Sequence, residues 1–131
     1  MVTVTRLLCF FLTSSLVSGQ NISGSWNWTY KAKHQSTITL KETRPNNYKG
    51  NYCSVFFNGM KIDCGIDQGS NGIFLTKTNE NIFTGTFECS FSNTYGTLKL
   101  EYLPDSKRIK IEVLKKPKGE FYLPSDVVFK K

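Results

Sequence analysis

Histidine is almost absent from this chain, since His34 is the only one among 131 residues. Nucleophilic catalysis by a serine or cysteine needs a base within hydrogen-bonding reach, and the polar neighbours of His34 predict a surface turn instead. Zinc sites need clustered Cys, His or carboxylate ligands, and the ten residues between Cys53 and Cys64 fit no zinc spacing. We therefore expect a protein that is not an enzyme and that holds neither a metal nor another cofactor.

Phosphate-binding and acid–base motifs are missing as well. No glycine-rich loop leads from a strand into a helix, as a phosphate-binding loop does. No stretch shows helical periodicity. The acidic residues do not suggest a catalytic pair, because we expect the following four to face solvent from turns or outward strand positions: Asp63, Asp67, Glu80 and Glu88.

After residue 20 the sequence has no apolar run long enough to span a membrane. At the N-terminus, Arg6 precedes the apolar stretch 7–12, and Val17-Ser18-Gly19 supplies small residues for cleavage. This pattern is typical of a signal peptide. We predict that residues 1–19 are removed and that residues 20–131 form a single secreted or periplasmic domain. A retained membrane anchor is the alternative.

Acidic residues are outnumbered by basic ones. Without Arg6, sixteen basic residues stand against ten acidic ones, a net charge of +6. Many of the basic residues lie late in the chain, at Lys107, Arg108, Lys110, Lys115, Lys116, Lys118, Lys130 and Lys131. Positive charge favours anionic partners such as nucleic acid or acidic polysaccharide. Basic and aromatic residues do not interleave as a nucleic-acid groove requires, so we expect a solvated basic face and no nucleic-acid partner.

The strongest local signal is Asn58-Gly59, which lies between two runs of β-forming residues and predicts a type I′ hairpin turn. Counting outward from this turn places Cys53 opposite Cys64, within the range that a disulfide bridges. Cys9 leaves with the signal peptide, so Cys89 remains as a free thiol that faces the core. Alternation puts the paired cysteines on one apolar face, which we expect to point inward together with Val55, Phe57, Met60 and Ile62.

Strand and turn signals repeat along the rest of the chain at intervals of about 8 to 12 residues, which is typical of an all-β barrel or sandwich. Alternating apolar and polar residues predict strands at 26–30, 37–41, 48–57, 60–64, 73–76, 82–91, 95–103, 108–114 and 127–129. Sequential hairpins with one apolar face favour a small antiparallel up-and-down β-barrel of about eight strands.

A large aromatic set is expected on the inner face of this barrel: Trp26, Trp28, Tyr30, Phe57, Phe83, Phe87, Phe91 and Tyr102. An eight-stranded barrel either fills its interior with side chains or holds one small ligand, and the sequence leaves both interpretations open. For the second, the candidate ligand-binding residues are Trp26, Trp28, Tyr30, Phe57, Phe87 and Tyr102, whose rings can line a pocket for a small apolar or aromatic molecule.

Three stretches together resemble a family of small secreted bacterial proteins of unknown function. They are Gly24-Ser25-Trp26-Asn27-Trp28, then Tyr52-Cys53-Ser54-Val55 with residues 58–64, and finally Gly119-Glu120-Phe121-Tyr122-Leu123-Pro124. The opening Gly-x-Trp strand is also similar to that of the calycin superfamily of lipocalins and avidins. The resemblance implies a calycin-like barrel and does not identify a ligand.

Our leading functional hypothesis is a monomeric binding module that carries a small ligand in a barrel mouth near Trp26, Trp28 and Tyr30. One alternative is a protein-binding inhibitor of a secreted hydrolase, acting through an extended N-terminal segment at Gln20 to Ser23. Another is a structural domain that interacts through its basic surface. Asn21 and Asn27 head glycosylation sequons, which are used only in a eukaryotic host.

Overall fold

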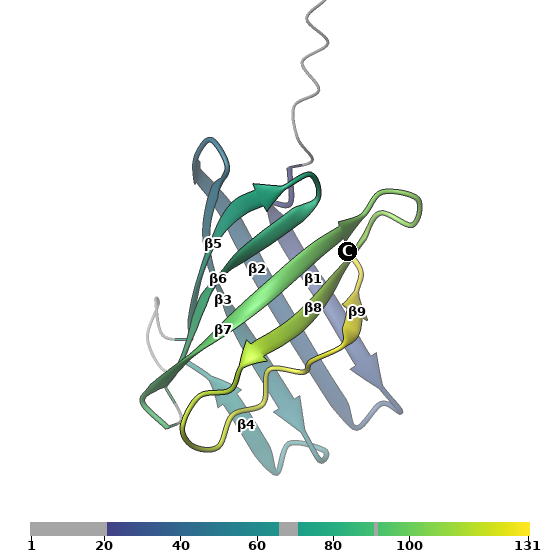
Figure 1. The fold of residues 1–131 in the computed structure, drawn as a ribbon. Helices are drawn as coiled ribbons and strands as arrows, with labels where there is room; N and C mark the ends of the chain where they lie inside the picture. The colour runs from purple at the N-terminus through teal and green to yellow at the C-terminus, as the bar shows by residue number, and fades with distance from the viewer. Residues whose placement is uncertain (1–20, 66–70, 91) are drawn as a thin grey trace, which may run out of the picture.

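The computed structural model describes residues 21–65, 71–90 and 92–131, and these form an all-β fold (Figure 1). The strands are β1 (Gly24–Tyr30), β2 (His34–Arg44), β3 (Asn47–Phe56), β4 (Lys61–Cys64), β5 (Gly72–Asn79), β6 (Ile82–Cys89), β7 (Thr94–Leu103), β8 (Arg108–Lys115) and β9 (Val127–Phe129). Among the described residues, no helix has the length and hydrophobicity needed to cross a bilayer. The predicted signal peptide, Asp67 and Phe91 lie outside the described residues.

Eight of the strands follow one another around a nearly closed antiparallel barrel in the order β1-β2-β3-β5-β6-β7-β8-β9. Closure is completed between β1 and the C-terminus. The Asn27 N–H donates to the Lys130 carbonyl at 2.6 Å, and the Lys130 N–H donates to the Asn27 carbonyl at 2.9 Å. These bonds occupy backbone groups that would otherwise lie at a free sheet edge. The predicted up-and-down barrel is confirmed.

Strand β4 lies outside this circular order because β3 changes partner along its length. The first half of β3 pairs with β5 from Asn47 to Asn51, and the second half pairs with β4 from Cys53 to Phe56. The sheet therefore divides at Tyr52. The register between β3 and β4 is the one that the Asn-Gly turn predicts, with Cys53 opposite Cys64, and the two cysteines form a disulfide.

The inward face of this hairpin is the opposite of the expected one. Tyr52, Ser54 and Asp63 are buried, whereas Cys53 is exposed and Ile62 and Met60 are 56% and 83% exposed. Along β3 the even-numbered residues point into the barrel, and the outward set includes the polar Lys49 and Asn51. The disulfide thus joins the two strands on the outer surface.

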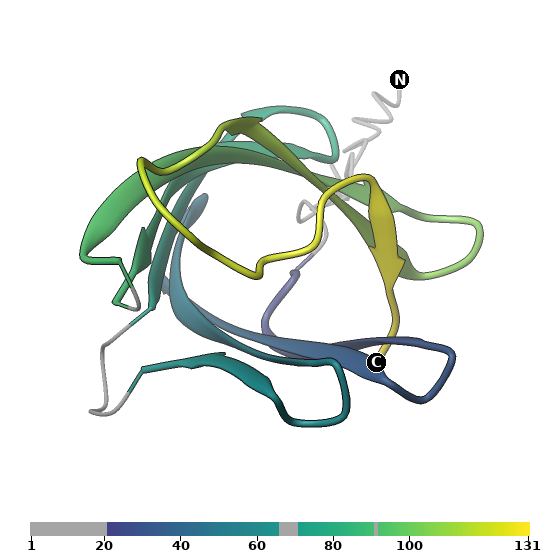
Figure 2. The ribbon, with the colours of Figure 1, turned by 90° about the horizontal axis from the view of Figure 1, so that it is seen from below.

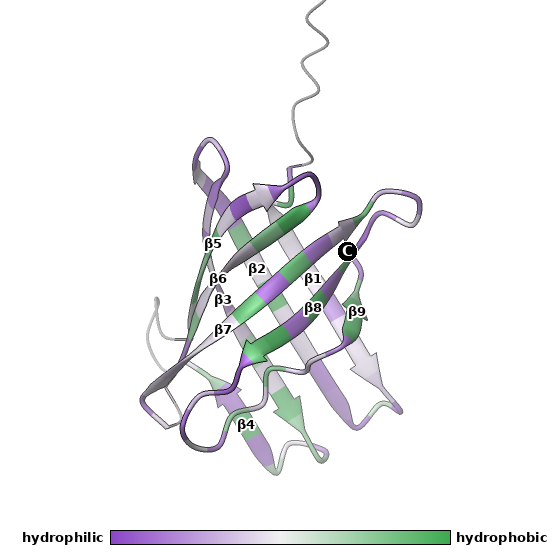
Figure 3. Ribbon diagram, viewed as in Figure 1, coloured by the Kyte–Doolittle hydropathy of each residue, from purple (hydrophilic) through white to green (hydrophobic). Residues whose placement is uncertain are grey.

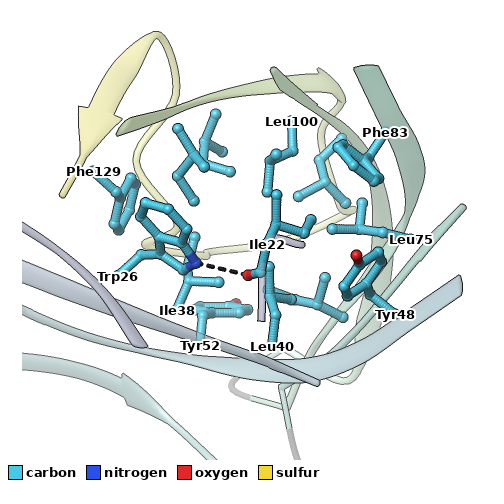
Figure 4. Close-up of a cluster of buried hydrophobic side chains, with 14 of the residues drawn as sticks. Ile22, Trp26, Ile38, Leu40, Tyr48, Tyr52, Leu75, Phe83, Leu100 and Phe129 are labelled. Atoms are coloured by element: carbon cyan, nitrogen blue, oxygen red, sulfur yellow. Dashed lines mark hydrogen bonds between the residues drawn. The ribbon is translucent and has the colours of Figure 1, made fainter. Parts of the chain in front are cut away.

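The interior is packed with apolar side chains contributed by β1 to β3, β5 to β9 and the segments flanking them. Figure 4 shows the Trp26 indole N–H donating to the Ile22 carbonyl, at 2.9 Å, in the middle of this core. Figure 3 shows the alternation of apolar and polar residues along β7 and β8 that places one face inward. The buried core comprises Ile22, Trp26, Ile38, Leu40, Tyr48, Tyr52, Ile73, Leu75, Phe83, Phe87, Leu98, Leu100, Ile109, Ile111, Leu123 and Phe129.

The first described residues are tied to the barrel. Ile22 is completely buried, and the Ser23 hydroxyl accepts a hydrogen bond from the Glu42 N–H at 3.0 Å. The expectation that Ile22 and Ser23 belong to an extended segment is therefore wrong. Gln20 lies outside the described residues.

Residues 116–126, here named the strap, run from β8 to β9 across one end of the barrel (Figure 2). Within the strap, Pro117, Leu123 and Pro124 are buried. Its C-terminal part is held to β8, since the Ser125 hydroxyl accepts the Val113 N–H at 2.8 Å and the Asp126 N–H donates to the Ile111 carbonyl at 2.7 Å. The strap thus covers the barrel end at which the β1–β2 and β3–β4 turns also lie (Figure 1).

Candidate functional site

The predicted inward aromatic residues divide into two groups. Trp26, Phe83 and Phe87 are buried, and Trp28 and Tyr102 are partly buried against the same core, as expected. Tyr30 and Phe57 are 50% and 51% exposed, so the expectation that they point into the barrel is wrong. Both lie beside turns at the strap end, where they join a larger group of rings.

We name this group the rim cluster and define it as Trp28, Tyr30, His34, Phe56, Phe57 and Tyr122. Phe56 lies at its centre, with its ring centroid 5.9 Å from that of Trp28, 4.8 Å from that of His34 and 5.3 Å from that of Tyr122. The cluster therefore brings together side chains from β1, β2, the β3–β4 hairpin and the strap.

Strand geometry aligns three of the rings. Trp28 and Tyr30 are two residues apart in β1 and share a face, and their rings are parallel to within 3° with centroids 6.4 Å apart. Tyr30 pairs with His34 across the β1–β2 turn, and these rings lie 6.1 Å apart at an angle of 14°. His34 was expected on an exposed turn, but it is half-buried among the other rings.

Two hydrogen bonds join the β1–β2 turn to the β3–β4 turn. The Phe57 N–H donates to His34 Nδ1 at 3.1 Å, and the Asn58 N–H donates to the Lys33 carbonyl at 3.0 Å. Because Nδ1 accepts, the imidazole proton in this arrangement belongs on Nε2. The two turns hold each other in place, which fixes the rings of the rim cluster that they carry.

Both turns contain residues in the left-handed backbone region. Lys31, Ala32 and Phe57 have φ angles of 52°, 57° and 55°. This conformation costs a residue with a Cβ roughly 1–2 kcal/mol relative to the right-handed region. Asn58 and Gly59, at 57° and 90°, are the residues that the type I′ turn prefers.

The surface around the rim cluster is apolar with a basic border. Met60 and Ile62 are exposed apolar side chains of the same β3–β4 hairpin. The Lys31 ammonium lies 5.2 Å from the centroid of the Tyr30 ring, a cation–π distance. Lys61 pairs with Glu120 of the strap at 3.2 Å. Exposed apolar areas of this type mark interaction surfaces in soluble proteins.

A buried polar group lies next to the rim cluster, where the sheet divides. We name it the seam cluster and define it as Tyr52, Asp63, Asn71 and Cys89. The Asp63 carboxylate, expected to face solvent, is 1% exposed and accepts hydrogen bonds from the Tyr52 hydroxyl at 2.9 Å and from Asn71 Nδ2 at 3.0 Å. The buried free thiol of Cys89 lies 3.6 Å from both carboxylate oxygens.

The seam cluster also connects the divided sheet to its neighbours. Asn71 Nδ2 donates to the Asp63 carbonyl at 2.9 Å, and Asn71 Oδ1 accepts the Ser90 N–H at 2.8 Å. No backbone hydrogen bonds of the described residues pair β4 with β6, and the hydrogen bonds of the Asn71 side chain connect the two segments instead. Within the described residues, every buried side-chain nitrogen and oxygen has a hydrogen-bond partner, as is normal for a folded interior.

Burial and hydrogen bonding set the ionisation of nearby tyrosines. Desolvation raises the pKa of Tyr52, and the Asp63 carboxylate raises it further, so Tyr52 stays a hydroxyl donor. At the strap, the hydrogen bond that Tyr122 donates to Glu120 raises the pKa of Tyr122 to about 12. The same hydrogen bond and the Lys61 ammonium lower the pKa of Glu120. These contacts fix the strap to β4 and hold the Tyr122 ring against Phe56.

Sequence reasoning missed His34, Phe56 and Tyr122 as members of the rim cluster and Asp63 as a buried residue. One signal was available for the hairpin. Tyr48, Tyr52, Ser54 and Phe56 are all even-numbered, and successive side chains of a strand point to opposite faces. All four therefore lie on one side of β3. The strap contacts have no comparable signal, because they join residues that are far apart in the sequence.

Two surface hollows lie away from the rim cluster. One, of about 390 Å³, is lined by Thr43, Arg44, Asn47, Tyr48, Lys49, Phe74, Leu75 and Thr76. The other, of about 290 Å³, is lined by Asn93, Thr94, Tyr95, Lys115, Lys116 and Lys118. Neither hollow is lined by any of the six predicted ligand-binding residues.

Within residues 21–65, 71–90 and 92–131, no three His, Cys, Asp or Glu side chains lie close enough together to hold a metal ion. Comparison of the chain with protein-family models, curated proteins and solved structures finds no match. We therefore infer the function from the geometry of the rim cluster and its surroundings.

Proposed function

We propose that this protein is an exported, non-enzymatic binding module whose ligand contacts the rim cluster. The observation that carries the proposal is a set of six aromatic rings gathered at the strap end of the barrel, with Tyr30 and Phe57 about half exposed. Two hydrogen bonds between the turns pre-organise these rings. Pre-organisation favours binding because less conformational entropy is lost when the ligand arrives.

The chemistry of the rim cluster favours an apolar or aromatic ligand. Parallel rings at Trp28, Tyr30 and His34 offer faces on which a flat molecule can stack. Met60 and Ile62 add apolar area, and the Lys31 ammonium suits a ligand with a negative group at its edge. We place the ligand on the barrel rim, because the strap crosses the mouth and its own Leu123 is buried in the core.

The six predicted ligand-binding residues then take different roles. Trp28, Tyr30 and Phe57 contact the ligand, whereas Trp26, Phe87 and Tyr102 pack in or against the core and do not contact the ligand. We also propose that the protein is related to the calycin-like barrels and is exported. The up-and-down topology, the Gly24-x-Trp26 opening and the Cys53–Cys64 disulfide support this view.

The test is titration with the anionic aromatic dye anilinonaphthalene sulfonate. We expect dye fluorescence to rise on binding the wild-type domain, and the Tyr30→Ala/Phe57→Ala variant to bind at least fivefold more weakly. A matched control is Phe74→Ala/Leu114→Ala, which removes two side chains of similar exposure elsewhere on the barrel. This control should change the affinity less than twofold.

Amide NMR spectra recorded during the same titration locate the dye. The Trp28 indole signal should shift, whereas that of the buried Trp26 should not. Equal losses of affinity in the rim and control variants would contradict the proposal, since they would mean that the dye binds nonspecifically.

A further inference from the structure

The hollow of about 290 Å³ lies between the β6–β7 turn and the point where β8 passes into the strap. Of the six described residues that line it, three are lysines: Lys115, Lys116 and Lys118. The others are Asn93, Thr94 and Tyr95. None of the six belongs to the rim cluster, so this hollow is a separate feature of the surface.

Local sequence explains how the lysines surround the hollow. A register shift between Thr97 and Leu98 pairs Lys115 with Thr97 at the end of the β7–β8 ladder. Pro117 follows and is buried, whereas the lysines on both sides of it are exposed. Proline fixes its own backbone angle and donates no hydrogen bond. The buried ring therefore anchors the chain and leaves the neighbouring ammonium groups in solvent.

The charge at this hollow is strongly positive. The ion pairs of the described residues join Lys61 to Glu120 and Lys99 to Glu112, and none involves the three lysines of the hollow. The acidic residue in register with Tyr95 is Glu88, on the adjoining strand β6. One carboxylate beside three ammonium groups leaves an excess of positive charge, which favours an anionic ligand.

Tyr95 adds a second kind of contact. Its side chain is 64% exposed although it lines the hollow, so one face of the ring is accessible to a ligand. Thr94 supplies a hydroxyl, which is within 2.7 Å of the Ser92 hydroxyl. An aromatic face beside hydrogen-bonding groups and cations is the combination that orients a ring-shaped polar molecule.

We propose that this hollow binds one anionic sugar unit of an acidic polysaccharide. The carboxylate or sulfate group lies among Lys115, Lys116 and Lys118, and the sugar ring lies against Tyr95. A nucleic-acid strand is less suitable, because its binding relies on several aromatic rings that stack successive bases, and among the described residues that line this hollow Tyr95 is the one with an aromatic ring. A volume of about 290 Å³ also suits a single small unit.

The experiment is isothermal titration of the whole domain with two probes, a heparin-derived hexasaccharide and a tetragalacturonate, at 50 and 200 mM salt. We expect binding of at least one of them, weaker at the higher salt because screening acts on exposed charges. The Lys115→Gln/Lys116→Gln/Lys118→Gln variant should bind at least tenfold more weakly. Tyr95→Leu should bind about fivefold more weakly while leaving the salt dependence unchanged.

The matched control is Lys107→Gln/Arg108→Gln/Lys110→Gln, which removes the same charge from the opposite end of β8. It should lower affinity less than threefold, and circular dichroism should show that all variants are folded. The proposal is overturned if the control loses as much affinity as the hollow variant, or if Tyr95→Leu binds like the wild type. Tighter binding of a twelve-residue thymidine oligonucleotide, lost in the hollow variant, overturns the choice of sugar.

Discussion

The Asp63 carboxylate accepts a hydrogen bond from the Tyr122 backbone N–H at 2.8 Å, across 59 positions of sequence. This bond joins β4 to the strap, because Asp63 lies in β4 and Tyr122 in the strap. The adjacent Lys61–Glu120 ion pair joins the same two segments. Since Tyr122 also contacts Phe56, the buried seam cluster supports the exposed rim cluster.

Asp63→Asn should destabilise the domain by roughly 2–4 kcal/mol. Removing the charge weakens hydrogen bonds from several donors, and an amide NH₂ cannot accept the bonds that the carboxylate oxygen accepted. Urea denaturation measures the loss. Glu88→Gln is the control, since Glu88 lies at the partly exposed end of β6, and it should cost less than about 0.5 kcal/mol. A similarly small effect at Asp63 would contradict a stabilising role for the seam cluster.

Stability should decline with pH above about 10, partly through Tyr52. Its pKa is raised in the folded state, so the unfolded chain releases the phenolic proton first. The stabilising effect is therefore complete below about pH 10 and is lost as pH rises further, at about 1.4 kcal/mol per pH unit. Urea midpoints between pH 8 and pH 11 test this, and Tyr52→Phe should show a shallower decline. If the urea midpoints of the wild type and of Tyr52→Phe fall equally steeply with pH, Tyr52 does not contribute to the pH dependence of stability.

Replacing both disulfide cysteines, as Cys53→Ala/Cys64→Ala, should cost at most about 2–3 kcal/mol. The bridge closes a short loop, with a sequence separation of 11, and short loops give small entropic stabilisation. In the wild type, the buried Cys89 thiol should react with iodoacetamide only after denaturation. Urea denaturation measures the loss of stability, and a peptide map shows the disulfide pairing and the alkylation of Cys89. Finding Cys89 in a disulfide would contradict the pairing.

Ala32→Gly should stabilise the domain by about 1 kcal/mol. Ala32 has a φ of 57°, and glycine adopts this region without the clash that a Cβ produces. Thermal unfolding measures the gain as a higher unfolding temperature. Ala32→Val adds a β-branched side chain at the same backbone angle and should lower the unfolding temperature. If both variants unfold at the wild-type temperature, the β1–β2 turn does not store strain.

Much of the fold could be predicted from the sequence because its signals are local. Alternation of apolar and polar residues depends only on the two-residue period of a strand, and it located the strands that form the barrel. Asn58-Gly59 set the register of the hairpin, since only a few residue pairs accept positive φ at both central turn positions. The Cys53–Cys64 pairing followed from that register.

The candidate site was predicted only in part. Trp28, Tyr30 and Phe57 belong to the rim cluster, but Tyr30 and Phe57, which the sequence interpretation placed inside the barrel, are about half exposed. The alternation of apolar and polar residues distinguishes the two faces of a strand, but it does not show which face is buried. In the β3–β4 hairpin the more apolar face turned outward, because the interior face is shared with Tyr48 and Tyr52 farther along β3.

The sequence by itself thus determined the strand class, the hairpin register and the pairing of the two cysteines, all of which depend on contacts between near neighbours. The tertiary structure alone decided that Asp63 is buried, that the strap covers one barrel end and that Lys115 and Tyr95 line the same hollow. These relationships join residues far apart in the chain. Their positions follow from how the sheet closes and where it divides, and no local pattern of residues specifies that geometry.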